Sequence, residues 1–102
     1  MSYLVGTDIG TMGTKTVLVD PEGRVQANSF REYGVLTPKQ GWAEQWPQVW
    51  AEATYATIKE AVEKSGVDPG DVAGSCVSSL YGGSGIPIDK DCTAIRPCLI
   101  WA

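Results

Sequence analysis

Alternating apolar and polar residues dominate the first third of the chain and predict β-strands. Residues 3–7 (YLVGT) are largely apolar and β-branched, and in residues 14–19 (TKTVLV) a Thr, Thr, Leu side alternates with a Lys, Val, Val side. Residues 24–33 (RVQANSFREY) predict a third strand. A glycine-rich turn at residues 9–13 and a DPEG turn at residues 20–23, with proline second and glycine fourth, separate the strands. Short turns between consecutive strands predict an antiparallel meander.

Helical spacing replaces this alternation after residue 46. Trp46-Pro47 predicts the start of a helix, because proline lacks the backbone N–H that the first helical turn leaves unused. Gly66 predicts its end. One apolar stripe at helical spacing lies between them, formed by Trp50, Thr54, Ile58, Ala61, Val62 and Ser65. Residues 34–45 have no such period and predict a surface loop, which the nearby tryptophans pack against the helix.

Short strand-like segments and turns alternate in the last third. Residues 71–80 predict a strand parallel to the first, because a helix intervenes, and residues 81–85 (YGGSG) interrupt it. The strand resumes at residues 86–89 (IPID), a hairpin-like excursion follows, and residues 98–102 (CLIWA) predict a last strand. These elements predict an α/β fold with a mixed sheet. Because the chain is apolar up to its final residue, we expect it to be the front part of a longer protein.

Composition narrows the classes of function. A length of 102 residues allows one domain at most, and the net charge of -4 argues against nucleic acid or a membrane surface as partner. The chain has no histidine, which excludes His-based catalysis or metal ligation within it. Three cysteines without CxxC spacing favour a reducing compartment, with Cys76 as a small core residue. No signal peptide or membrane-length apolar run is present, so we expect a cytoplasmic location.

The first turn carries the candidate chemistry. Two Gly-Thr pairs lie between an acid and a base, namely Asp8, Gly10, Thr11, Gly13, Thr14 and Lys15. Glycine permits close approach and positive φ, and successive backbone N–H groups form a concavity that binds anions. A carboxylate beside phosphate is favourable when Mg²⁺ lies between them. The turn is therefore predicted to hold Mg-nucleotide phosphates, and a tight hairpin with no ligand is the alternative. It is not a P-loop, because GxxxxGK[ST] is absent and a strand follows.

Three segments, in order, resemble the N-terminal part of the FGGY-type carbohydrate kinases, which include glycerol kinase, xylulokinase, ribulokinase and gluconokinase. They are DIGTMGTKTVLVD (8–20), GWAEQWPQVWAEA (41–53) and GIPIDKDCTAIRPCLIWA (85–102), and the likeness covers essentially the whole chain. It implies a ribonuclease H-like fold of the actin-like ATPase type. Residues 1–102 would form part of the N-terminal domain, with its remainder and a second domain outside this chain.

The resemblance also implies the cofactors ATP and Mg²⁺ and a set of site residues. Asp8 matches the acid associated with Mg²⁺, and Lys15 matches a position usually held by Arg or Lys. The phosphate-facing turn corresponds to Gly10, Thr11, Gly13 and Thr14. The sugar-facing positions correspond to Tyr81, Gly82, Gly83 and Trp101. The two glycines fall where relatives carry a polar pair such as Met-His or Arg-Glu, so the sugar is open, and a bend in a strand is their alternative role. Glu44 and Gln45 are expected to be structural.

The expected activity of the complete protein is ATP-dependent phosphorylation of a small-molecule sugar. A pentulose such as xylulose or ribulose is favoured, because the ending of the chain resembles that of pentulose kinases. The family's catalytic aspartate lies downstream of this segment, so we expect no catalytic base here and no activity from this chain alone. A homodimer is possible when the protein is complete, because dimers are common among relatives. Two alternatives are a non-catalytic nucleotide-binding or regulatory member of the superfamily, and an unrelated small α+β domain with a coincidental turn.

Overall fold

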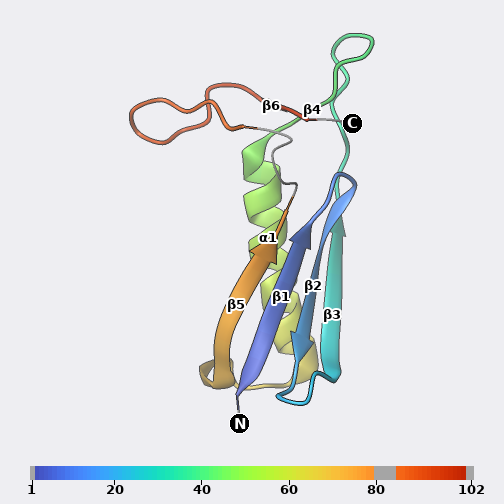
Figure 1. Cartoon of the computed structure of the whole chain (residues 1–102), viewed down its shortest axis with the longest axis vertical. Helices are drawn as coiled ribbons and strands as arrows, with labels where there is room; N and C mark the ends of the chain where they lie inside the picture. The colour runs from blue at the N-terminus through green and yellow to red at the C-terminus, as the bar shows by residue number, and fades with distance from the viewer. Residues whose placement is uncertain (1, 80–84, 101–102) are drawn as a thin grey trace.

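A four-stranded mixed sheet forms the body of the molecule. The computed structural model describes residues 2–79 and 85–100. The strand order is β3-β2-β1-β5 (Figure 1), and its strands are β1 (Tyr3–Ile9), β2 (Gly13–Val19), β3 (Val25–Glu32) and β5 (Val72–Ser78). The first three are antiparallel, and β5 is parallel to β1. The predicted meander, the parallel fourth strand and the mixed α/β class are therefore confirmed.

One helix, α1 (Pro47–Ser65), covers one face of this sheet, mainly over β2 and β3 (Figure 1). Pro47 occupies the first turn as predicted, and Gly66 ends the helix in the left-handed region with a φ of 72°. A short 3-10 helix, η1 (Pro69–Asp71), leads into β5. The first turn of the sheet, between β1 and β2, lies at the same end of the molecule as the N-terminus of α1.

The core between sheet and helix is small and partly polar. Val5, Leu18 and Ala61 form its buried apolar cluster, with Ile58 and Val62 packed against it. The buried line of α1 consists of Ala53, Thr57 and Ala61. The predicted stripe thus lies beside the core, but its fully buried line differs from the prediction. Of its six residues Ala61 is buried and the other five are half-buried. The residues of the buried line are small, and the Thr57 hydroxyl lies 2.8 Å from the Thr16 hydroxyl of the sheet.

Two short segments form a second, two-stranded sheet beside the first turn. β4 (Glu44–Gln45) pairs with β6 (Cys98–Leu99), and Leu36 makes an isolated bridge to Glu44. The predicted loop over residues 34–45 thus contains a strand. The predicted strand at residues 86–89 is wrong, because only an isolated bridge from Ile88 to Ala94 occurs there.

The sheet face opposite α1 carries no helix within residues 2–79 and 85–100 (Figure 1). We call it the open face. It includes Leu4, Asp8, Lys15 and Phe30, all exposed. Cys76 is also exposed, on edge strand β5 beside Gly6, so its prediction as a core residue is wrong. No helix in the described part of the chain is long and apolar enough to cross a membrane.

Candidate phosphate-binding site

The residues predicted to meet nucleotide gather at the β1–β2 turn. Asp8 lies near the end of β1 and is the cross-strand partner of Lys15 on β2. Both side chains are exposed on the open face. Within the described ranges neither one forms an ion pair within 4.0 Å. A carboxylate and an ammonium group therefore flank the turn with their charges available to a ligand.

The four carbonyl groups of residues 10–13 all accept hydrogen bonds from the protein. The Gly10 N–H donates to Gly13 O at 2.9 Å, and the Tyr33 N–H donates to Met12 O at 3.1 Å. The Tyr33 hydroxyl donates to Gly10 O at 2.6 Å. The Gln45 side-chain amide donates to Thr11 O at 2.7 Å. The negative ends of these peptide dipoles are thus engaged by the protein.

The backbone donors at the tip of the turn are in the opposite situation. Among the residues that the structure describes, the N–H groups of Thr11 and Met12 have no hydrogen-bond acceptor. Met12 is exposed and Thr11 is half-buried. Two adjacent N–H groups without internal acceptors, beside carbonyls that are all engaged, are therefore available to donate to an anion.

The two turn glycines serve close packing instead of positive φ. The glycines with positive φ in the described chain are Gly23, Gly41 and Gly66, so the expectation of positive φ at Gly10 and Gly13 is wrong. A Cβ on Gly13 would lie 2.3 Å from Phe30 Cζ and 2.7 Å from Arg31 O. A Cβ on Gly10 would lie 3.1 Å from Gly13 O. Gly13 is therefore required because β3 approaches too closely for a side chain.

Thr14 does not face outward. Its side chain is fully buried, and its hydroxyl lies 3.0 Å from the Tyr33 hydroxyl. Because the Tyr33 proton is given to Gly10 O, the Thr14 hydroxyl donates to Tyr33. This placement differs from the prediction that the Thr14 hydroxyl meets phosphate, since the buried hydroxyl helps to hold Tyr33 behind the turn.

The pKa of Tyr33 supports this donor role. Burial, partly offset by the hydrogen bond from Thr14, raises the pKa of the phenol above its ordinary value, and the negative charge of Asp8 raises it further. The hydroxyl therefore stays protonated at neutral pH and can donate to Gly10 O. Sequence reasoning did not single out Tyr33, because nothing in the local pattern indicates a partner 23 residues away.

The second and third sequence motifs meet beside this turn. Arg96 forms an ion pair with the buried carboxylate of Glu44, and β4 pairs with β6. Gln45 follows Glu44 and contacts the turn directly. The structural role expected for Glu44 and Gln45 agrees with these contacts. Arg96 was not among the predicted site residues, although its ion pair with Glu44 adds a side-chain link between the two motifs to the pairing of β4 and β6. The predicted sugar-facing residues Tyr81, Gly82, Gly83 and Trp101 lie outside the described residues.

The donor set fits a Mg²⁺ ion that arrives with a nucleotide. Within the described residues no group of three or more acidic or cysteine side chains could hold a metal ion by itself. Mg²⁺ keeps several water ligands and commonly binds one or two carboxylates together with phosphate oxygens. Asp8 supplies one exposed carboxylate beside the turn, which matches that mode and does not match a permanently bound metal.

Comparison with known proteins defines the class. Residues 3–102 match the N-terminal domain of the FGGY family of carbohydrate kinases, and the chain belongs to this family. Its mixed sheet and helix match the N-terminal part of that actin-like ATPase domain.

The names of individual relatives give different substrates. The chain is 33% identical over 101 residues to xylulose kinase of Bacillus subtilis, covering 99% of this chain and 20% of that protein. The structure of gluconate kinase from Lactobacillus acidophilus superposes with a TM-score of 0.87 at 29% identity, over 98% of this chain and 20% of that one. Plasmodium falciparum glycerol kinase with ADP, at 15% identity, shares the fold with a TM-score of 0.80, over 99% of this chain and 20% of that one. The chain thus spans about a fifth of the length of these relatives.

Proposed function

We propose that the complete protein, of which this chain is the N-terminal part, is an ATP-dependent sugar kinase and that the β1–β2 turn binds the phosphates of ATP. The observation that carries the proposal is the turn itself, with its carbonyls engaged and the N–H groups of Thr11 and Met12 directed to no internal acceptor. Family membership and the ADP complex of the glycerol kinase relative support the nucleotide.

In this proposal the residues of this chain bind and orient the nucleotide, and they do not carry out the proton transfer. The N–H groups of Thr11 and Met12 donate to phosphate oxygens, and the ammonium group of Lys15 adds positive charge beside them. Asp8 would hold Mg²⁺, directly or through water, and the bound ion would supply positive charge against the charge that builds up on the transferred phosphoryl group. The base that takes the proton of the sugar hydroxyl is expected from sequence beyond residue 102.

The proposed substrate is a pentulose such as xylulose or ribulose. The 33% identity to a xylulose kinase over nearly the whole chain supports this choice. Identity of this size also links the chain to a gluconate kinase and therefore does not decide the sugar.

A substrate panel tests the proposal. We expect the complete protein to release ADP from ATP with xylulose or ribulose, and more slowly or not at all with glycerol and gluconate. The isolated chain of residues 1–102 serves as a control and should release none. Preference for gluconate or glycerol would overturn the substrate. ADP binding without ADP release on any sugar would favour a non-catalytic family member.

A further inference from the structure

Two residues behind the β1–β2 turn, Tyr33 and Gln45, bind three of its four carbonyl groups. We infer that Tyr33 and Gln45 are positioning residues, which hold the turn with its N–H groups toward the nucleotide. This inference rests on the proposed function of the turn. Neither residue contacts the ligand in this account, and both act through the backbone of residues 10–12.

Tyr33 makes two of these contacts from the position just after β3. Its hydroxyl donates to Gly10 O at 2.6 Å and its N–H donates to Met12 O at 3.1 Å. The hydroxyl is itself fixed, because it accepts from the buried Thr14 hydroxyl. A phenylalanine at this position would keep the ring and the backbone contact. It would lose the bond to Gly10 O, and the buried Thr14 hydroxyl would lose its acceptor.

Both polar atoms of the Gln45 side chain have hydrogen-bond partners within the protein. It is 3% exposed, and its side-chain NH₂ donates to Thr11 O at 2.7 Å and to Gly34 O at 3.2 Å. Its side-chain oxygen accepts from the Trp50 indole N–H at 2.9 Å. The reversed orientation would bring oxygen against two carbonyls and NH₂ against a donor, so the network fixes the amide as described.

The physical consequence concerns the direction of the peptide dipoles. A peptide group whose carbonyl is bound on the protein side presents its N–H on the ligand side. Fixed donors cost no reorganisation when an anion binds, whereas a free turn must be ordered first. Loss of either clamp therefore weakens binding of the phosphate-bearing ligand and leaves the sugar site unaffected.

The test is a steady-state comparison of Tyr33→Phe and Gln45→Glu in the complete protein. Gln45→Glu keeps the shape and the acceptor for Trp50, but it removes both donors and brings a carboxylate oxygen against the carbonyls of Thr11 and Gly34. Loss of one hydrogen bond corresponds to a change of about two- to tenfold in binding, so we expect Tyr33→Phe to raise the KM for ATP by about that factor. Gln45→Glu loses two donated bonds, and we expect it to raise the KM for ATP at least as much. The KM for the sugar should change less than about twofold, which a general loss of structure would not produce.

Matched controls exist on α1. Tyr55→Phe and Gln48→Glu make the same chemical changes at exposed positions, and both should leave the KM for ATP unchanged. Thermal melts identify any variant that does not fold. If Tyr33→Phe fails to fold, Gln45→Glu carries the test, and if both fail, Thr14→Val removes the hydrogen bond that fixes Tyr33.

Calorimetric titration with Mg-ADP separates this inference from the proposed function. If the unchanged protein binds Mg-ADP and the folded variants bind it equally well, the positioning role is wrong and the proposed function stands. If the unchanged protein binds no Mg-ADP, the proposed function and this inference both fail. Weaker Mg-ADP binding by the two variants, with unchanged binding by the two controls, supports the inference even without turnover.

Discussion

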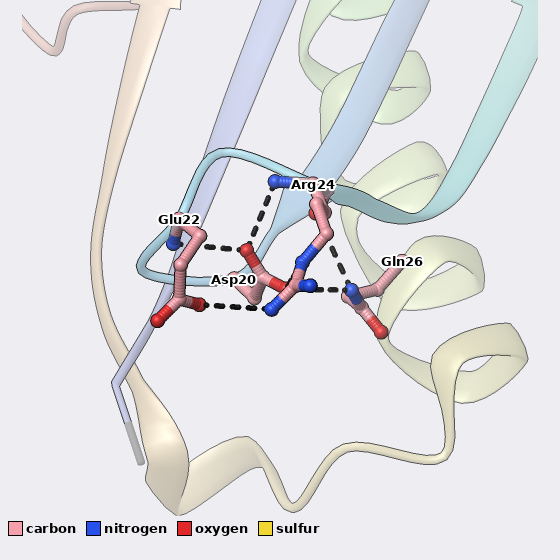
Figure 2. A network of polar contacts seen from close by, with 4 residues as sticks. All are labelled: Asp20, Glu22, Arg24 and Gln26. Atoms are coloured by element: carbon pink, nitrogen blue, oxygen red, sulfur yellow. Dashed lines mark hydrogen bonds and ion pairs between the residues drawn. The ribbon is translucent and has the colours of Figure 1, made fainter.

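Within the described chain, the carboxylate that accepts the most hydrogen bonds is that of Asp20. It lies at the opposite end of the sheet from the candidate site. Asp20 closes the β2–β3 turn (Figure 2) and accepts hydrogen bonds from the N–H groups of Glu22 and Arg24, the Arg24 guanidinium and the Gln26 amide. The backbone bond from Arg24 is the largest cause that lowers the pKa of Asp20 below its ordinary value, and burial partly opposes it. Asp20 therefore favours its charged form in the folded state.

The pKa shift predicts the pH dependence of one variant. A carboxyl group whose folded-state pKa is lowered adds stability above its unfolded-state pKa and loses it as the pH falls through the folded-state pKa. At pH 7 we expect Asp20→Asn to unfold at a lower temperature than the unchanged protein. The difference should shrink as the pH is lowered from about 4. Thermal melts at several pH values check this, with exposed Asp91→Asn as control. A constant difference across that range would contradict it.

At the scale of single residues, the charged groups of the candidate site could be predicted from the sequence. The residues that hold the turn in place could not. Asp8 and Lys15 could be predicted because they stand on either side of one short glycine-rich turn in the sequence. Tyr33 and Gln45 were not found as parts of the turn, since their partners Gly10 and Thr11 lie 23 and 34 residues away. The positive φ expected of Gly13 does not occur. Glycine is required there for another reason, since β3 approaches too closely for a side chain.

At the scale of elements, a chain of buried hydroxyl groups joins the sheet to α1 behind the turn. Thr57 donates to Ala53 O within the helix and therefore accepts from Thr16 at 2.8 Å. Thr16 in turn lies 2.8 Å from the Thr7 hydroxyl. These hydroxyl groups thus link the three elements β1, β2 and α1. The sequence predicted the helix and its length, but apolar spacing alone does not reveal that its buried line centres on a threonine.

Removal of the middle hydroxyl should destabilise this junction. Thr16→Val keeps the volume but leaves the buried Thr7 hydroxyl without this partner. We expect a loss of about 1–3 kcal/mol in the free energy of unfolding, the usual cost of an unsatisfied buried polar group. Denaturant unfolding of the complete protein measures it. The exposed Thr37→Val should change stability by less than about 0.5 kcal/mol. Equal effects of the two variants would show that the hydroxyl chain does not matter.

At the scale of the whole molecule, three segments that are distant in sequence meet at one end of the sheet. The first motif forms the β1–β2 turn, Gln45 of the second motif binds that turn, and Arg96 of the third motif pairs with Glu44. The pattern of strands and helix predicted the mixed sheet, and the family resemblance rests on the order of the three segments. Neither predicted the contacts between the segments, which depend on a two-stranded sheet, β4 and β6, that has no periodic signal in the sequence.

The central claim is that this end of the molecule binds Mg-nucleotide through the turn and Asp8. The most direct test is the kcat of Asp8→Asn in the complete protein, measured with its preferred sugar at saturating Mg²⁺ and ATP. The exposed Asp91→Asn makes the same change away from the turn and should leave kcat unaltered. We expect Asp8→Asn to lower kcat about 10- to 100-fold with an unchanged circular dichroism spectrum, as for loss of a group that orients a metal. An unchanged kcat would contradict the account.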